Sequence, residues 1–168
     1  MKQVLATERL KLREMTLDDL DFVAAMLDHP EVMRFYPKRY TRDEARAWIE
    51  RQVQRYADHG HGLWLVVERE SQAPVGQVGL MMQEVEGTWE PEIGYLVHRP
   101  YWRRGYASEA ARSVREYAFG VLDRPKVISL IRPENIPSQG VARTLGMAPQ
   151  REVDFKGFRH IVFATWQR

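Results

Sequence analysis

The sequence contains no cysteine, which excludes disulfides, thiolate metal sites and a cysteine nucleophile. It also lacks any apolar run that approaches the roughly 20 residues needed for a membrane helix. The N-terminal segment is interrupted by charge at Glu8 and Arg9, so we expect no signal peptide. These absences favour a cytoplasmic protein that does not insert into a membrane.

A strong excess of charge of one sign is missing as well. The 25 Lys and Arg residues face 23 Asp and Glu residues, which leaves a net charge of +2. This balance disfavours a nucleic-acid-binding protein. Lys is scarce and Arg is common, and the planar donor fork of Arg suits phosphate or carboxylate ligands.

What is present is typical of a folded globular chain. The 168 residues are 44% hydrophobic and 29% charged, values of an ordinary globular protein with a buried core. No repeat, low-complexity tract or linker interrupts the chain. We therefore expect one domain over residues 1–168.

Periodicity predicts seven strands and four helices. Two capping-box patterns, Thr16–Asp19 and Thr41–Glu44, each predict a helix start. The strands are expected at 8–14, 63–68, 75–84, 92–98, 126–131, 148–155 and 158–166, and the helices from 16 to 27, 41 to 57, 107 to 121 and 137 to 145. The order β-α-α-β-β-β-α-β-α-β-β predicts an α+β fold in which helices cover both faces of a mixed sheet.

The segment between Glu92 and Ala107 carries the clearest chemical signal. A strand ends, a short basic loop with Arg103 and Arg104 follows, and a helix begins after Gly105. The first N–H groups of a helix lack intrahelical partners and, with the helix dipole, attract anions. Glycine lets the backbone approach such an anion closely. The turn is therefore a candidate phosphate site, although it matches neither the Walker nor the Rossmann glycine pattern.

Residues 93–110 read IGYLVHRPYWRRGYASEA and resemble the coenzyme-binding motif of the GNAT superfamily of N-acetyltransferases. The superfamily pattern is [QR]-x-x-G-x-[GA], and this chain departs from it at Trp102. A second segment, Asn135-Ile136-Pro137-Ser138 followed by Leu145-Gly146-Met147, is similar to the branch of ribosomal-protein N-terminal acetyltransferases and their small-molecule-acetylating relatives. The resemblance includes the opening TERLKLRE and spans nearly the whole chain.

The resemblance implies a single-domain fold with a mostly antiparallel seven-stranded sheet, about four helices and a splayed central strand pair. It also implies acetyl-CoA as co-substrate and no metal. The donor would lie between the strands at 92–98 and 126–131, and its arm would pair with the backbone of Tyr95, Leu96 and Val97. Its pyrophosphate would lie on the turn formed by Trp102, Arg103, Arg104, Gly105, Tyr106, Ala107 and Ser108. Asn135 and Ser138 would complete the donor site.

The implied reaction is direct attack of a primary amine on the thioester in a ternary complex. The backbone N–H of Val97 would stabilise the oxyanion, and the hydroxyl of Ser138 would stabilise the leaving thiolate. A carboxylate must accept the amine proton, and Glu92 is the first choice. Glu84, Glu86, Glu90 and Glu92 lie within nine residues, and such a cluster would also attract a cationic substrate. An ordinary solvated hairpin is the alternative explanation of the cluster.

The acceptor site is expected between residues 31–40 and 154–159, with walls from Phe35, Tyr36, Trp89 and Phe155. The acceptor itself stays open: an amine-bearing small molecule or a protein N-terminus both fit, and a homodimer is compatible with the resemblance. His98, at the end of the key strand, is expected to be structural. His59 and His61 do not form a metal pattern.

Two rival interpretations stay open. In the first, the chain is a catalytically silent acyl-CoA-binding or regulatory module on the same fold, since fold does not fix function. Alternatively, Arg103 and Arg104 would bind nucleic acid, which predicts salt-dependent affinity and no response to CoA.

Overall fold

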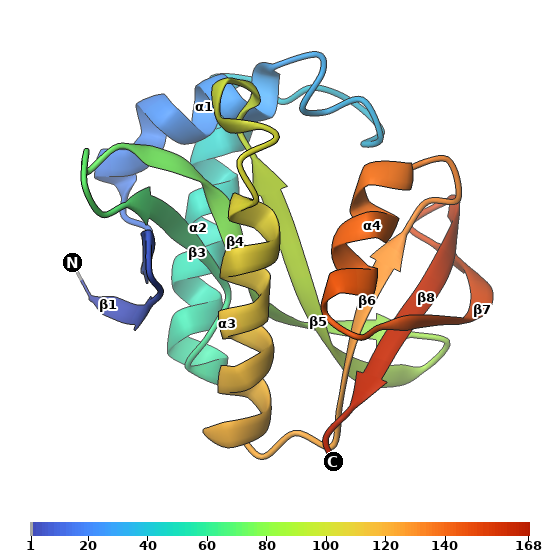
Figure 1. Cartoon of the computed structure of the whole chain (residues 1–168). Coiled ribbons are helices and arrows are strands. Elements are labelled where there is room, and N and C mark those ends of the chain that lie inside the picture. The colour runs from blue at the N-terminus through green and yellow to red at the C-terminus, as the bar shows by residue number, and fades with distance from the viewer. Residues whose placement is uncertain (1) are drawn as a thin grey trace.

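The computed structural model describes residues 2–168 as a mixed sheet with helices on both faces (Figure 1). The strands are β1 (Gln3–Ala6), β2 (Leu10–Arg13), β3 (Leu63–Glu68), β4 (Pro74–Val85), β5 (Thr88–Val97), β6 (Lys126–Ile131), β7 (Ala148–Phe155) and β8 (Phe158–Trp166). The helices are α1 (Leu20–Asp28), α2 (Arg42–His59), α3 (Tyr106–Gly120) and α4 (Ile136–Thr144). The fold class and the four helices predicted from the sequence are confirmed.

The sheet has eight strands, one more than predicted. Its order is β1-β2-β3-β4-β5-β6-β8-β7, and every neighbouring pair is antiparallel except β5 with β6. The additional strand, β1, has only four residues and forms the edge of the sheet beside β2. A strand this short shows too little alternation to be recognised, because pairing with β2 rather than its own pattern defines it.

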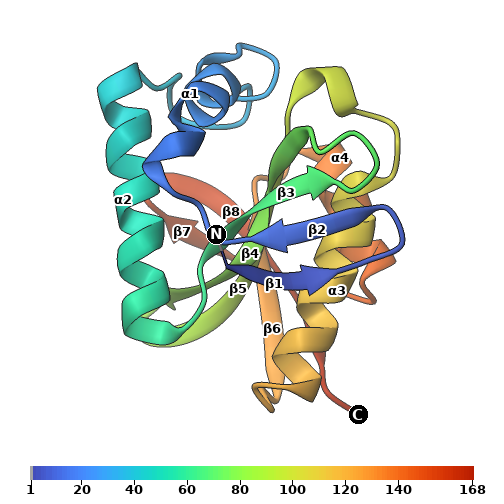
Figure 2. The same cartoon turned by 90° about the vertical axis from the view of Figure 1, so that its left-hand side faces the viewer.

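Two apolar layers cover the sheet. Helices α3 and α4 lie on one face and α1 and α2 on the other, as Figure 2 shows from the side. The first layer includes Trp64, Ile93 and Val114, and the second includes Met26, Ile49 and Leu65, all six almost fully buried. The helices are therefore fixed to a common scaffold, and the loops at their ends take their positions from it.

Both predicted capping boxes are present. Thr16 accepts a backbone hydrogen bond while Asp19 bonds back to the Thr16 N–H, and Thr41 and Glu44 do the same at the start of α2. The first box opens a short 3-10 turn, Leu17–Asp19, that leads into α1. Within residues 2–168, none of the helices is both long and apolar enough to cross a membrane.

The central strands β5 and β6 are joined by a single ladder pair and then diverge. Glu92 pairs with Ile128, and beyond this point the strands open as a V (Figure 1). The expected splay is thus present, and it leaves the C-terminal half of β5 without a strand partner on one side.

Candidate active site

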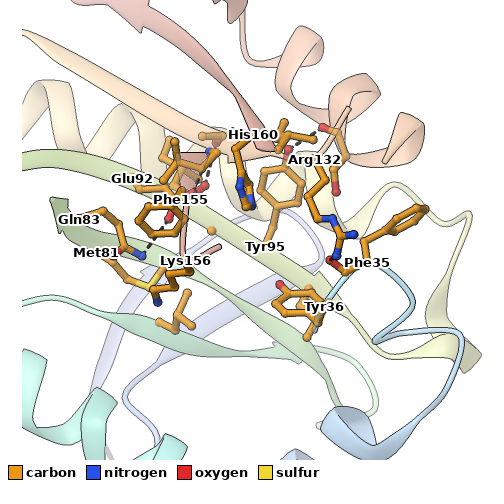
Figure 3. A pocket seen from close by; sticks show the side chains of 18 of the residues that line it. Phe35, Tyr36, Met81, Gln83, Glu92, Tyr95, Arg132, Phe155, Lys156 and His160 are labelled. Carbon is orange, nitrogen blue, oxygen red and sulfur yellow. Dashed lines mark hydrogen bonds between the residues drawn. The ribbon is translucent and has the colours of Figure 1, made fainter. Parts of the chain in front are cut away.

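A cavity of about 430 Å³ lies beside the opening between β5 and β6. Its walls come from the segment after α1, from α2, from the splayed strands and from the β7–β8 hairpin (Figure 3). Phe35, Tyr36 and Phe155 line it, as predicted. The prediction is wrong for Trp89, which lies on the β4–β5 hairpin with 62% of its surface exposed. Trp89 pairs with Glu84 close to the turn of the β4–β5 hairpin, whereas the cavity is lined by hairpin residues farther from the turn, Gln83 and Glu92.

Glu92 lies at the point where the strands separate. One carboxylate oxygen accepts the Leu130 N–H of β6 at 2.8 Å, and the other accepts the Gln83 side-chain amide at 3.1 Å (Figure 3). The carboxylate therefore replaces a backbone carbonyl as the acceptor for β6. Burial raises the pKa of the Glu92 carboxyl, although the two donors act in the opposite direction. Such a carboxylate is more basic than an exposed one.

The expected cluster of acids does not assemble in the cavity. Glu90 forms an ion pair with Lys126 at 2.7 Å and Glu86 pairs with Arg151 at 2.9 Å, whereas Glu84 is exposed. Among the described residues, Glu92 is the one carboxylate that lines the cavity. The cations that line it are Arg51, Arg55, Arg132 and Lys156. A cavity of this composition does not attract a purely cationic substrate.

The backbone of β5 presents alternate residues to the opening. The His98 N–H donates to the Val75 carbonyl of β4 at 2.9 Å, and Leu96 lies opposite Gln77 of β4. The direction of backbone hydrogen bonding alternates along an antiparallel strand. The N–H and C=O of Leu96 therefore point toward β4, whereas those of Tyr95 and Val97 point toward the side where β6 diverges. The sequence does not distinguish these three backbones, since the direction depends on the register with β4.

Trp102, the departure from the superfamily pattern, has a defined place. Its indole Nε1 donates to the Val97 carbonyl at 2.7 Å, and the Arg99 guanidinium lies 4.8 Å from the centre of its ring. The indole thus fixes the Val97–His98 peptide group, which is the one directly after the proposed oxyanion donor, the Val97 N–H. Nothing in the sequence predicts this contact.

The turn before α3 has the geometry of an anion site. Arg103 has φ 63° and Gly105 φ 77°, both left-handed, and Gly105 is the N-cap. The first N–H to pair into the helix is that of Glu109, which donates to Gly105 O at 3.0 Å. The amides of Tyr106, Ala107 and Ser108 therefore precede the intrahelical ladder, as expected for helix N-termini.

Side chains from the other end of the sequence hold this turn in place. The Glu109 carboxylate accepts the Thr7 hydroxyl at 2.5 Å and the Arg9 Nε at 2.8 Å. The Tyr106 hydroxyl donates to Glu68. These contacts carry no signal in the sequence, because nothing in local spacing links residues that lie 38, 100 and 102 positions apart.

Asn135 and Ser138 lie at the start of α4, across the opening from β5. The Asn135 side chain caps the helix by accepting the Ser138 N–H at 3.2 Å, and the Tyr95 hydroxyl donates to the Ser138 carbonyl at 2.6 Å. Asn135, Ser138 and Tyr95 all line the cavity. The backbone of Ser138 is thus fixed at both its polar groups.

Of the histidines, His160 lines the cavity (Figure 3), whereas His98 and His61 have structural surroundings. His98 packs edge-on against Phe22 and His29, each with ring centroids 5.6 Å away. His61 is buried, and its Nδ1 lies 2.7 Å from the Leu80 carbonyl. Within residues 2–168, no group of three or more side chains capable of holding a metal ion is present.

Comparisons with known proteins identify the family and the fold. The family model described as "Acetyltransferase (GNAT) domain" matches residues 9–148. YnaD, an uncharacterized N-acetyltransferase of Bacillus subtilis, is 31% identical over 90% of this chain and 85% of its own. The crystal structure of an acetyltransferase from Agrobacterium tumefaciens superposes with a TM-score of 0.86 at 25% identity, over 99% of this chain and 95% of that one.

A more distant structure shares the fold. RimL, a ribosomal L7/L12 alpha-N-protein acetyltransferase solved with coenzyme A, has a TM-score of 0.81 at 13% identity and covers 98% of both chains. The match of the family model over most of the chain, together with the curated relative, decides the family. This chain belongs to the GNAT family and is an N-acetyltransferase.

Proposed function

We propose that the protein transfers the acetyl group of acetyl-CoA to a primary amine by direct attack in a ternary complex. The observation that carries the proposal is the opening between β5 and β6, which is lined on one side by backbone groups without a strand partner and leads to the α3 turn. In RimL, the same fold holds coenzyme A.

The residues around the opening fit an acyl-CoA. The backbones of Tyr95 and Val97 offer an edge to which an extended amide-bearing arm can add like a strand. The free amides at the start of α3 suit a pyrophosphate, and Arg103 and Arg104 add positive charge beside them. Asn135 and Ser138 face β5 from α4 and complete the donor site.

Three groups of this chain serve the reaction. Glu92 accepts the amine proton, directly or through water, and its raised pKa makes it a better base. The Val97 N–H stabilises the oxyanion, an interaction worth about 3–4 kcal/mol in comparable sites. Ser138 donates a hydrogen bond to the departing thiolate. The amine must be neutral to attack, which at pH 7 costs roughly 4–5 kcal/mol for a Lys-like amine and roughly 1 kcal/mol for an α-amine.

The acceptor is a small amine or a protein N-terminus. RimL acts on the α-amine of a ribosomal protein, and the walls of Phe35, Tyr36 and Phe155 admit either kind of acceptor. Substrate choice in such folds lies in loops rather than in the shared scaffold.

Thiol release from acetyl-CoA in the presence of a panel of amines tests the proposal. We expect turnover with at least one amine, and a fall of about 10²- to 10⁴-fold in Glu92→Gln, the range for loss of a general base. Ser138→Ala should lower kcat with little change in donor affinity. Glu84→Gln, an exposed residue on β4, is the matched control and should leave turnover unchanged.

The rival module predicts a different result. If acetyl-CoA raises the melting temperature while no amine in the panel is consumed, the chain is a silent acyl-CoA-binding protein and the proposal fails. Absence of any calorimetric heat on addition of acetyl-CoA would contradict both.

A further inference from the structure

The cavity contains cations that lack acidic partners. Arg51 and Arg55 lie four residues apart on α2, so their side chains project from the same face of the helix. Arg55 donates to the Gln52 side-chain oxygen at 3.1 Å and contacts the Met81 sulfur at 3.3 Å. Among the described residues, no carboxylate lies within ion-pair distance of either arginine.

Lys156 approaches the same space from the opposite wall. It is at the tip of the β7–β8 hairpin, and its ammonium lies 5.2 Å from the centre of the Phe155 ring. Figure 3 shows Lys156 between Phe155 and Met81. Within the part of the chain that the structure describes, it too has no ion-pair partner.

Other basic side chains nearby are already neutralised. Arg132, which also lines the cavity, pairs with Glu134 at 2.7 Å and donates to the Phe35 carbonyl at 2.8 Å. Arg159 of the same hairpin as Lys156 lies within reach of Glu152 and Asp154. Among the described residues, surface arginines such as Arg46 also lack an ion-pair partner, as do the exposed Arg51 and Lys156. What distinguishes the cavity is Arg55, which is half-buried without one.

An unpaired cation that is partly withdrawn from water is unfavourable unless an anion approaches it. Burial and the neighbouring Arg51 lower the pKa of Arg55, although the more distant charge of Glu92 acts in the opposite direction. Glu92 is the one acid among the lining residues, and its carboxylate is already engaged by Gln83 and Leu130. These neutral donors leave the charge of Glu92 in place, but one carboxylate faces four lining cations, so an anionic ligand would improve the charge balance of the cavity.

We propose that the acceptor is a small amine that also bears a carboxylate or phosphate, with the anion held by Arg55, Arg51 and Lys156 and the amine directed toward Glu92. This inference rests on the proposed acetyltransfer and specifies its substrate class. The volume of about 430 Å³ is of the size used for small ligands. Polyamines and aminoglycosides, which carry several positive charges and no anion, are excluded by the same cations.

Matched acceptor pairs test the inference. Each pair has one anionic and one neutral member: amino acids against their carboxamides, and phosphoethanolamine against ethanolamine. Thiol release should show a kcat/KM that is higher for the anionic member by roughly 10- to 100-fold, the effect expected from charge-assisted hydrogen bonds. The pair that shows the larger preference distinguishes carboxylate from phosphate.

Variants locate the source of the preference. Arg55→Gln should lower kcat/KM for the anionic members by roughly 10- to 100-fold and leave the neutral members nearly unchanged. Arg55→Lys, which keeps the charge, should retain part of the preference, and Lys156→Met should weaken it. Arg46→Gln, an exposed arginine of the same helix outside the cavity, is the matched control and should have no effect.

Several results would overturn the inference. One is equal use of both members of each pair, and another is an Arg55→Gln variant that slows both members alike. Preferential use of spermidine, or of an uncharged peptide with a free N-terminus, would do the same and would leave acetyltransfer itself intact. If none of these amines is consumed, the proposed acetyltransfer fails as well. The two failures are therefore distinguished by whether any amine is acetylated.

Discussion

At the scale of single residues, Glu92 has two tasks that share one carboxylate. It accepts hydrogen bonds from Leu130 of β6 and Gln83 of β4, and in the proposed reaction it accepts a proton. Both tasks depend on its burial, which raises its pKa and keeps the donors in place. Its place on the strand that the family resemblance assigns to the oxyanion donor makes Glu92 the first choice of base, but its link to β6 depends on tertiary structure.

The pH dependence of turnover follows from this residue. With an acceptor of fixed amine pKa, kcat/KM should rise with pH as Glu92 loses its proton, and the midpoint of that limb should lie above the ordinary Glu pKa because burial raises it. The steeper part of the profile, below the pKa of the acceptor amine, should disappear in Glu92→Gln and persist in Glu84→Gln, whereas the limb from the amine itself remains in both. A profile of unchanged steepness in Glu92→Gln would show that another group takes the proton.

Trp102 gives a second prediction at this scale. Trp102→Phe removes the donor to the Val97 carbonyl, a hydrogen bond worth about 1 kcal/mol. Because Trp102 is 36% exposed, water replaces the lost donor and the melting temperature should change little. We expect kcat to fall about five- to tenfold. Trp89→Phe, on the exposed hairpin, is the control, and equal losses in both variants would contradict a specific role.

At the scale of elements, local chemistry predicts where a helix begins better than it predicts which side of the helix is buried. The capping boxes at Thr16 and Thr41 identify the two helix starts because their partners are three residues away. On α2, the apolar Val53 is 45% exposed, while the polar Gln52 is fully buried. Gln52 occupies that position because its side-chain oxygen accepts the Leu63 N–H, which no helical pattern encodes.

The same limit applies to the site. The α3 turn is predictable, since the glycine, the arginines and the helix lie together in the sequence. The cationic wall of the cavity is not, because α2 and the β7–β8 hairpin meet there only after the sheet has formed. The prediction that Trp89 lines the acceptor site is wrong for the same reason, since the position of the β4–β5 hairpin relative to the cavity depends on the assembled sheet.

Two glycines predict opposite effects of one substitution. A Cβ on Gly79 of β4 would overlap the Gly62 carbonyl oxygen, whereas a Cβ on Gly120 of α3 meets nothing within 4 Å. Gly79→Ala should therefore lower the free energy of unfolding by about 1–3 kcal/mol or more. Gly120→Ala should raise it by about 0.5–1 kcal/mol. Urea unfolding measures both, and a harmless Gly79→Ala would contradict the close approach of β3 and β4.

At the scale of the whole molecule, the sheet consists of two parts that meet at β5 and β6. One part has strands β1–β5 with α1 and α2 on one face, and the other has β6, β8 and β7 beside α4. The proposed donor and acceptor both lie where the parts meet. Contacts of Glu92 with Leu130 and of Ser129 with the Ile93 carbonyl cross this boundary.

Global stability should therefore respond to the protonation of Glu92. Its raised pKa means that, between the ordinary and the raised value, the folded chain binds more protons than the unfolded chain. The free energy of unfolding then falls as pH rises through that window, as far as Glu92 contributes. Glu92→Gln removes this contribution, so the variant should gain stability relative to the native chain as pH increases.

Urea unfolding of both proteins between about pH 4.5 and pH 8 measures the difference. Glu84→Gln serves as control and should follow the native pH profile. Parallel profiles for the native chain and Glu92→Gln would show that Glu92 does not carry the expected linkage.

The single ladder pair at Glu92 and Ile128 has a mechanical consequence. Other neighbouring strands are hydrogen-bonded over several residues and therefore move together. The β5–β6 pair is joined at one ladder position. A change in the angle between the two parts would strain few sheet contacts, among them the Glu92–Leu130 and Ser129–Ile93 hydrogen bonds. An extended ligand in the proposed donor site would supply the hydrogen bonds that β6 does not make, so we expect donor binding to make the sheet more rigid.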